Sequence, residues 1–207
     1  MVETLFGDFL MKIISMSKED KNFKEMKKFF IERTKNHIFL VQKYCKRIEE
    51  YGDGEFNGLI ERGLIHDKSK FQEPEKTPYI YLTWSYKCKS EGKKYDYPIG
   101  IEDETVVATE HHIKNKNNSH HPECHCDKET SLINKDDRDK APKEMIDATK
   151  MKEIDIAEMV ADFCAVSEER KTDPEDWANK NINKRWKFTK YQEALIYELI
   201  EAAWGED

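Results

Sequence analysis

Histidine and aspartate side chains recur along the chain in an order that suits a metal site. The chain has seven histidines, and five of them fall within residues 111–125. An earlier one, His37, shares a predicted helical face with Thr34 and Val41, where a histidine on its own would be a core residue. Imidazole and carboxylate groups are the usual ligands of Fe, Mn and Zn ions. The sequence therefore predicts a metal centre, with candidate histidine ligands His37, His66, His111, His112, His120 and His121.

The dipeptide His66-Asp67 follows an apolar stretch that is predicted to be a helix. Adjacent side chains within a helix point about 100° apart, so the pair cannot chelate one ion from inside the helix. At a helix end the backbone can turn both side chains toward one centre. We therefore expect the helix to end here.

A later helical segment carries Asp155, Glu158 and Asp162 on one stripe. Carboxylates rarely enter an apolar face unless they are paired or bind a metal. Asp162 stands between an alanine and a phenylalanine, so we expect it to be buried and to bind metal, and we expect Asp155 to be solvated. Glu158, one turn before Asp162, is expected to orient a ligand histidine or to take a proton.

A structural zinc site at Cys124, His125 and Cys126 is the alternative reading of the histidine-rich segment. Structural zinc sites usually combine two separated ligand pairs, and the C-x-C spacing is tight for such a pair. A third metal ion bound by Cys124 or Cys126 is a further alternative. Cysteine-based catalysis has weaker support, because no cysteine has an activating context.

Four short motifs, HDKSKF, EHHIKN, NSHHPE and AEMVADF, occur in this order within residues 30–170. The set resembles the HD-domain superfamily of metal-dependent hydrolases, and more narrowly a family of uncharacterised HD-like proteins from bacteria, phages and large viruses. The resemblance implies an all-α bundle with a central metal site. It also implies that one ion is held by His37, His66, Asp67 and Asp162, and a second by residues of the two HH pairs, with Asp67 bridging.

The resemblance further implies a metal-dependent phosphohydrolase, with Asp67, Lys70 and Glu158 as catalytic residues and Lys70 near a phosphate oxygen. The expected substrate is a small phosphate ester, such as a nucleotide or a nucleotide-derived signal. The expected cofactor is one or two divalent transition-metal ions, with Fe, Mn, Zn, Co and Ni not distinguished and Mg also open. An HD-type di-iron oxygenase and a non-catalytic metal- or nucleotide-binding protein are the alternatives.

Apolar residues recur with helical period along most of the chain, and no alternating pattern supports a sheet. We predict an all-α bundle of about six to eight helices and a single domain over residues 1–207. Its core spans residues 22–170, with an N-terminal amphipathic helix over 2–16 and C-terminal helices over 174–204 packed on it. The other expected helices cover 20–50, 56–65, 74–90, 103–113 and 142–170, with a loop over 114–142.

The composition excludes several classes of protein. Lys and Arg number 35 against 42 Asp and Glu, a net charge of −7 that gives no strong nucleic-acid signal. Ten Phe, nine Tyr and four Trp can close a core, which argues against disorder although only 38% of residues are hydrophobic. No transmembrane segment or signal peptide is expected, and five scattered cysteines do not make a disulfide scaffold. We expect a cytoplasmic protein, with homo-oligomerisation left open.

Overall fold

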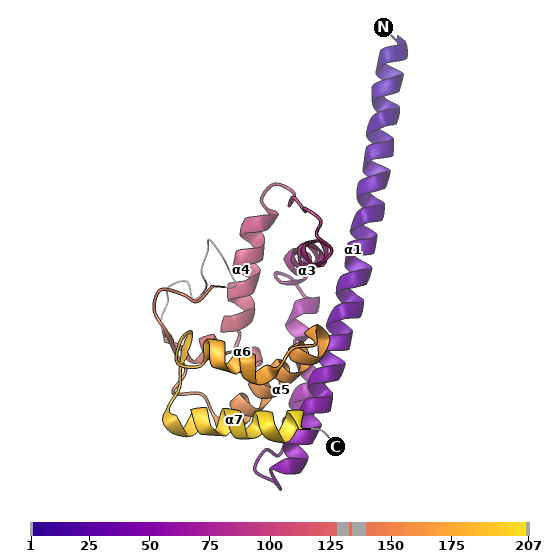
Figure 1. The fold of residues 1–207 in the computed structure, drawn as a ribbon. Coiled ribbons are helices and arrows are strands. Elements are labelled where there is room, and N and C mark those ends of the chain that lie inside the picture. Colours follow the sequence, from indigo (N-terminus) through magenta and orange to yellow (C-terminus); the bar gives the residue numbers. More distant parts are fainter. Residues whose placement is uncertain (1, 128–132, 134–139, 206–207) are drawn as a thin grey trace.

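The computed structural model describes residues 2–127, 133 and 140–205, with side chains from residue 22 onward. Across these residues the fold is mostly helical, with only a small two-stranded sheet, which confirms the predicted all-α class (Figure 1). The α-helices are α1 (Val2–Tyr51), α2 (Leu59–Ile65), α3 (Lys76–Ser90), α4 (Ile101–Lys114), α5 (Glu153–Arg170), α6 (Pro174–Asn181) and α7 (Lys190–Trp204). Short elements complete them: the 3₁₀ helices η1 (Lys68–Phe71), η2 (Lys116–Asn118) and η3 (Pro122–His125), and the strands β1 (Ile146–Asp147) and β2 (Trp186–Lys187).

The N-terminal region forms one helix where the sequence predicted two. The expected break between residues 16 and 20 is wrong, because α1 runs without interruption from Val2 to Tyr51. Asp20 and Asn22 are residue types that often cap a helix, but no Gly or Pro lies beside them, and Asp and Asn cost a helix interior far less than Pro does. The prediction that residues 2–16 pack on the core involves side chains that lie outside the described residues.

Helix α5 is the centre of the bundle. It packs against α1, α2, α6 and α7, and nearly every residue from Asp155 to Ser167 is buried. A helix that is buried all round belongs to a core rather than to a surface. The apolar residues around it include Val41 and Ile48 from α1 and Leu199 from α7. A second apolar cluster joins α1, α3 and α4 through Met26, Phe30, Tyr79, Ile80, Leu82 and Ala108.

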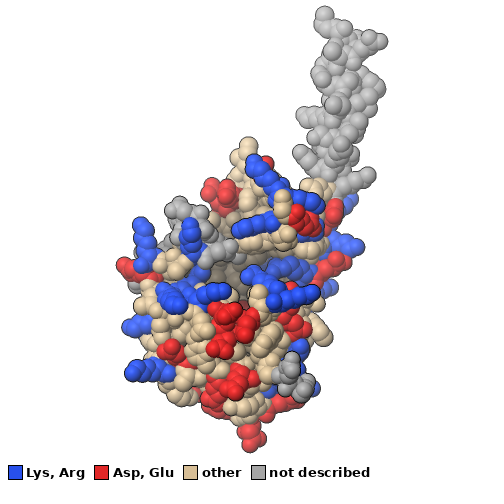
Figure 2. All heavy atoms as spheres, in the orientation of Figure 1, with Lys and Arg blue, Asp and Glu red and all other residues tan. Residues whose placement is uncertain are grey.

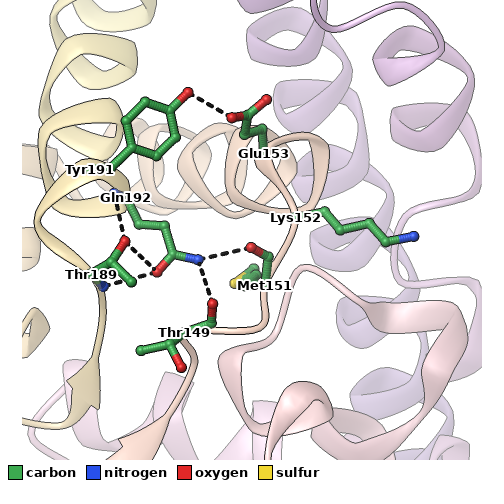
Figure 3. Close-up of a pocket in the computed structure, with 7 residues that line it drawn as sticks. All are labelled: Thr149, Met151, Lys152, Glu153, Thr189, Tyr191 and Gln192. Atoms are coloured by element: carbon green, nitrogen blue, oxygen red, sulfur yellow. Dashed lines mark hydrogen bonds between the residues drawn. The ribbon is translucent and has the colours of Figure 1, made fainter.

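The segment before α5 is extended, so the predicted start of this helix at residue 142 is wrong. Strand β1 pairs in parallel with β2, which places Ile146 opposite Trp186 and corrects the expectation that no sheet forms. From α7, Gln192 Nε2 donates to the carbonyl oxygens of Thr149 (3.2 Å) and Met151 (2.8 Å), as Figure 3 shows. In a helix these carbonyl oxygens would accept backbone hydrogen bonds, so the bonds from Gln192 compete with helix formation. The strands are only two residues long, which is too short for an alternating pattern of apolar residues to show in the sequence.

Figure 3 also shows a surface pocket beside this junction, with a volume of about 450 Å³. It is lined by Thr149, Met151, Lys152, Glu153, Thr189, Tyr191 and Gln192. None of the predicted metal ligands lines it. The pocket lies where α7 meets the start of α5. Among the described residues, no helix has a stretch long and apolar enough to cross a bilayer.

Candidate metal centre

The backbone turns sharply at His66-Asp67, as predicted for a helix end. Helix α2 ends at Ile65, and His66 leaves the helix with φ −48° and ψ 135°. Asp67 then adopts the left-handed conformation, with φ 58° and ψ 12°. This conformation costs an ordinary residue roughly 1–2 kcal/mol, and Asp and Asn tolerate it best after Gly. The turn aims two buried side chains, His66 and Asp67, into one region of the bundle.

A first donor group is formed by His37 of α1, His66, and Asp162 of α5. One ligand atom from each lies within 4.8 Å of the others. His37 Nε2 lies 3.0 Å from Asp162 Oδ1. Asp67 Oδ2 lies 3.8 Å from both His37 Nε2 and His66 Nε2, so this carboxylate borders the group.

A second donor group is formed by Asp67, His112 of α4, and the consecutive His120 and His121. His112 Nε2 lies 3.1 Å from Asp67 Oδ1. The rings of His120 and His121 have centroids 4.1 Å apart, and those of His112 and His121 are 4.8 Å apart. Asp67 therefore turns one oxygen toward each donor group.

Five donor atoms of these groups are buried and have no hydrogen-bond partner. They are His66 Nε2, Asp67 Oδ1, His112 Nε2, His120 Nε2 and His121 Nε2. Each buried polar atom left unpaired costs about 1–3 kcal/mol, so native proteins contain few of them. Lone pairs of nitrogen and oxygen that converge in this way are the ligands that divalent transition metals prefer. The residues present therefore fit a metal ion.

Glu158 of α5 holds the far side of two of these imidazoles. Its Oε1 lies 2.9 Å from His66 Nδ1 and 3.2 Å from His120 Nδ1. When Nδ1–H faces a carboxylate, the lone pair on Nε2 is left facing the metal side. The other oxygen of Glu158 accepts from Arg62 Nε at 2.7 Å. Both oxygens are engaged, so Glu158 lies behind the donor groups and is placed to orient ligands rather than to take a proton.

The expected burial of two aspartates is reversed in the structure. Asp155, expected to be solvated, is only 4% exposed, whereas the side chain of Asp162 keeps 20% exposure. Asp155 Oδ1 accepts from Arg62 NH2 and from Ser119 Oγ, each at 2.7 Å. The positive charge of Arg62, which comes from another helix, offsets the cost of burying this carboxylate. No feature of the α5 sequence indicates this partner.

His111 does not join the donor groups, although it was a candidate ligand. Its side chain is 44% exposed, and its Nδ1 lies 2.7 Å from Glu75 Oε1. His111 and His112 are neighbours on α4, so helical geometry directs only one of them, His112, to the centre. Glu75 itself is fully buried and was missed by the sequence reasoning, because a glutamate after Pro74 reads as the start of a helix.

Lys70 lies beside the carboxylate that borders both donor groups. Its Nζ forms an ion pair with Asp67 Oδ2 and sits 5.4 Å from the centre of the Tyr79 ring. Burial opposes the charge on Lys70, but the attraction of Asp67 outweighs it and raises the pKa of the amine. A full positive charge therefore stands next to the proposed metal ligands.

The carboxylates of the centre are ionised at neutral pH. Burial opposes the charge on Asp67, but Lys70 and the neighbouring histidines outweigh it and hold its pKa well below the usual range. Burial also opposes the charge on Asp162, and the hydrogen bond from His37 outweighs it and lowers that pKa. Ionised carboxylates are the form that binds metal.

Two imidazoles of the second donor group are kept neutral, the form in which histidine binds metal. Burial and the nearby His66 lower the pKa of His120, and burial with the adjacent His120 lowers that of His121 well below 6.5. Burial also opposes charge on His66, but Asp67 and Glu158 outweigh it and raise its pKa.

Two residues of the alternative zinc site, Cys124 and His125, bond to backbone carbonyl oxygens. Cys124 Sγ donates to the carbonyl oxygen of Asn115 at 3.5 Å, and His125 Nε2 donates to that of Ser119 at 2.8 Å. Cys124, His125 and Cys126 are absent from the metal-competent donor groups found among the described residues.

Comparison with known protein families matches residues 26–202 to the family described as "Family of unknown function (DUF5662)". This range contains every residue of both donor groups. No curated protein matches the chain, and no solved structure matches it. Because the match covers most of the sequence, the chain belongs to the family of unknown function DUF5662.

Proposed function

We propose that this protein is a metal-dependent phosphohydrolase whose centre holds two divalent transition-metal ions. The observation that carries the proposal is the set of buried, unpartnered donor atoms in the second donor group and at His66 Nε2, with Asp67 bordering the first group as well. A relationship to the HD-domain superfamily is part of the proposal, since the order His37, His66-Asp67, the two HH pairs and Asp162 is the order found in that superfamily.

In this proposal the first ion is held by His37, His66, Asp67 and Asp162. The second is held by Asp67, His112, His120 and His121. His111, which faces away from the centre, is left out of both sets. A divalent ion held there supplies a Lewis acid that lowers the pKa of a bound water from 15.7 toward about 7.

Lys70 would supply positive charge to an oxygen of the substrate phosphate. Its flexible side chain would let the ammonium group move from Asp67 to the phosphate. Its side chain is partly exposed, so an incoming group can reach it. Glu158 would act as a positioning residue, because its oxygens face His66, His120 and Arg62.

The distribution of charge supports an anionic substrate despite the net charge of −7. Figure 2 shows a hollow in the molecular surface, with Lys and Arg side chains to its left and right and Asp and Glu side chains below it. Positive side chains beside a cleft raise the local concentration of anionic ligands. A small phosphate ester, and among these a nucleotide, is the substrate we propose.

The first test is metal content. Protein purified without added metal is analysed by inductively coupled plasma mass spectrometry, beside His66→Ala. We expect near-stoichiometric metal in the wild type and a clear loss in the variant. A wild type that neither retains metal nor binds Mn²⁺, Zn²⁺ or Fe²⁺ after chelation would overturn the proposal.

The second test is turnover. Mono- and diesters of p-nitrophenyl phosphate and a panel of nucleotides are assayed without oxygen, with Mn²⁺ added. Hydrolysis that is lost in Asp162→Ala supports the proposal. Turnover that needs oxygen, together with visible absorption of a reducible iron centre, would replace it with a di-iron oxygenase. Metal binding with no turnover on any ester would indicate a binding protein.

A further inference from the structure

We propose that Glu75 is the positioning residue of the second donor group and decides whether the centre holds one ion or two. The inference rests on the proposed function, because it requires ions at both groups. It concerns a residue outside the HD, HH and late-Asp motifs.

Glu75 gathers three donors from two parts of the chain. It is fully buried at the start of α3. Its Oε2 lies 2.8 Å from His112 Nδ1 and accepts from Ser69 Oγ at 2.8 Å, while its Oε1 lies 2.7 Å from His111 Nδ1. A single carboxylate thus ties α4 to the η1 segment that follows Asp67.

The tautomer of His112 depends on this carboxylate. Asn118 Nδ2 also lies 2.9 Å from His112 Nδ1, and it donates to the His112 carbonyl oxygen at 3.0 Å. An amide NH₂ can only donate, so it cannot accept a proton from His112 Nδ1. Glu75 is the closest acceptor there, and it keeps the hydrogen on Nδ1 and the lone pair on Nε2, facing Asp67.

Without Glu75, Asn118 would become the nearest strong partner of His112. Its NH₂ would donate to Nδ1, and the hydrogen of the ring would move to Nε2. A protonated Nε2 has no lone pair for a metal ion. The second donor group would then lose one of its three histidines while its other residues stayed in place.

The first donor group does not share this dependence. His66 is held by Glu158, which is backed by Arg62, whereas the hydrogen bonds described for Glu75 go to Ser69, His111 and His112. The first group also has its own carboxylate, Asp162, whereas the second group has only the shared Asp67. Removing Glu75 should therefore weaken the binding of the second ion and leave the binding of the first ion unchanged.

The test measures ion stoichiometry and affinity in chelator-stripped protein. Co²⁺ is titrated into wild type, Glu75→Ala and Glu75→Gln, followed by calorimetry and by the visible absorption of the bound metal. We expect two ions in the wild type. In Glu75→Ala we expect the first dissociation constant to be unchanged and the second to rise about 10- to 100-fold, the usual effect of losing such a partner. Glu75→Gln should partly rescue the second ion, because its carbonyl oxygen can still accept from His112 Nδ1.

Glu73→Ala is the matched control, since Glu73 is an exposed carboxylate of the same segment whose described hydrogen bonds come from Thr77. It should bind both ions as the wild type does. Circular dichroism and thermal melting check the fold of each variant. If Glu75→Ala does not fold, Glu75→Gln decides alone, with an expected rise of about threefold or more in the second constant.

The outcomes separate the two proposals. A wild type that binds no ion defeats the proposed function itself. A wild type that binds two ions, with both constants unchanged in the folded Glu75 variants, overturns only the role of Glu75. Equal loss of both ions in a folded Glu75 variant also overturns it, because the effect would not be selective.

Discussion

Asp67 Oδ1 lies 3.1 Å from His112 Nε2, yet neither atom has a hydrogen-bond partner. Two buried polar atoms that approach so closely without sharing a proton are well placed to share a cation. The other oxygen of Asp67 faces His37 and His66. One side chain therefore borders both donor groups, which makes Asp67 the most sensitive position of the proposed centre.

We predict that Asp67→Asn abolishes the binding of both ions while the protein still folds. Asn tolerates the left-handed backbone as Asp does, but it lacks the charge that binds a divalent cation. Both dissociation constants should rise by more than the roughly 10- to 100-fold expected for an outer partner such as Glu75. Calorimetric titration with Co²⁺ measures this, and tight binding of either ion would contradict the bridging role.

Lys70→Ala should separate catalysis from metal binding. The variant frees Asp67 from its ion pair, so metal affinity should stay the same or increase. Turnover should fall, because a charged hydrogen bond to phosphate contributes about 1.5–3 kcal/mol, or roughly 10- to 100-fold in kcat/KM. Lys68→Ala is the control, since Lys68 is exposed. Equal loss of activity in both variants would show that Lys70 has no specific role.

Arg62→Met should destabilise the protein even in the absence of metal. Arg62 pairs with the buried carboxylates of Asp155 and Glu158, and its removal leaves both without their cation. Breaking a buried pair costs about 3–5 kcal/mol, and the 27% exposure of the Arg62 side chain reduces this to about 2–4 kcal/mol. Urea unfolding of the chelated protein measures the change, with Arg170→Met, at the exposed end of α5, as control. A loss below about 0.5 kcal/mol, the range of neutral surface substitutions, would contradict the pairing.

A pH-dependent link joins α1 to α5 through Glu168. Its Oε2 accepts from Tyr44 OH at 2.6 Å and from Lys43 Nζ at 2.7 Å, and these bonds lower its pKa below the usual 4.5. A lowered carboxyl pKa stabilises the fold above the unfolded value and loses this effect as pH falls through the folded value. Glu168→Gln should therefore lower the melting temperature at pH 7 and have a much smaller effect near pH 3. An equal effect at both pH values would exclude an ionic contribution.

The residues of the candidate centre could be picked out from the sequence because their chemistry is unusual for a helical core. His37, His66, Asp67 and Asp162 stood out as polar residues in apolar, helical surroundings. The choice between His111 and His112 could not be made, because it depends on the rotation of α4 about its axis. Glu75, Arg62 and Asp155 could not be assigned either, since each owes its burial to a partner from a distant segment.

The all-α class of the fold could be predicted from the sequence, whereas the ends of several helices could not. Helices α3 and α4 lie within a few residues of their expected ranges. The start of α5 could not be predicted because β1 and the Gln192 side chain hold residues 146–151 out of the helix, and such tertiary bonds leave no local signal. Helix α1 differs in the opposite direction, since it is longer than predicted. Residue types that often cap a helix, such as Asp20 and Asn22, lie within it without ending it.

The first donor group joins α1 to α5, two helices from opposite parts of the chain. During synthesis His37 leaves the ribosome long before Asp162 does, so a nascent chain that ends before Asp162 cannot offer the complete set of ligands. Ion uptake at this group would then mark the moment when the two ends of the bundle have closed on each other. The visible spectrum of bound Co²⁺ would follow this closure in a refolding experiment, independently of helix content.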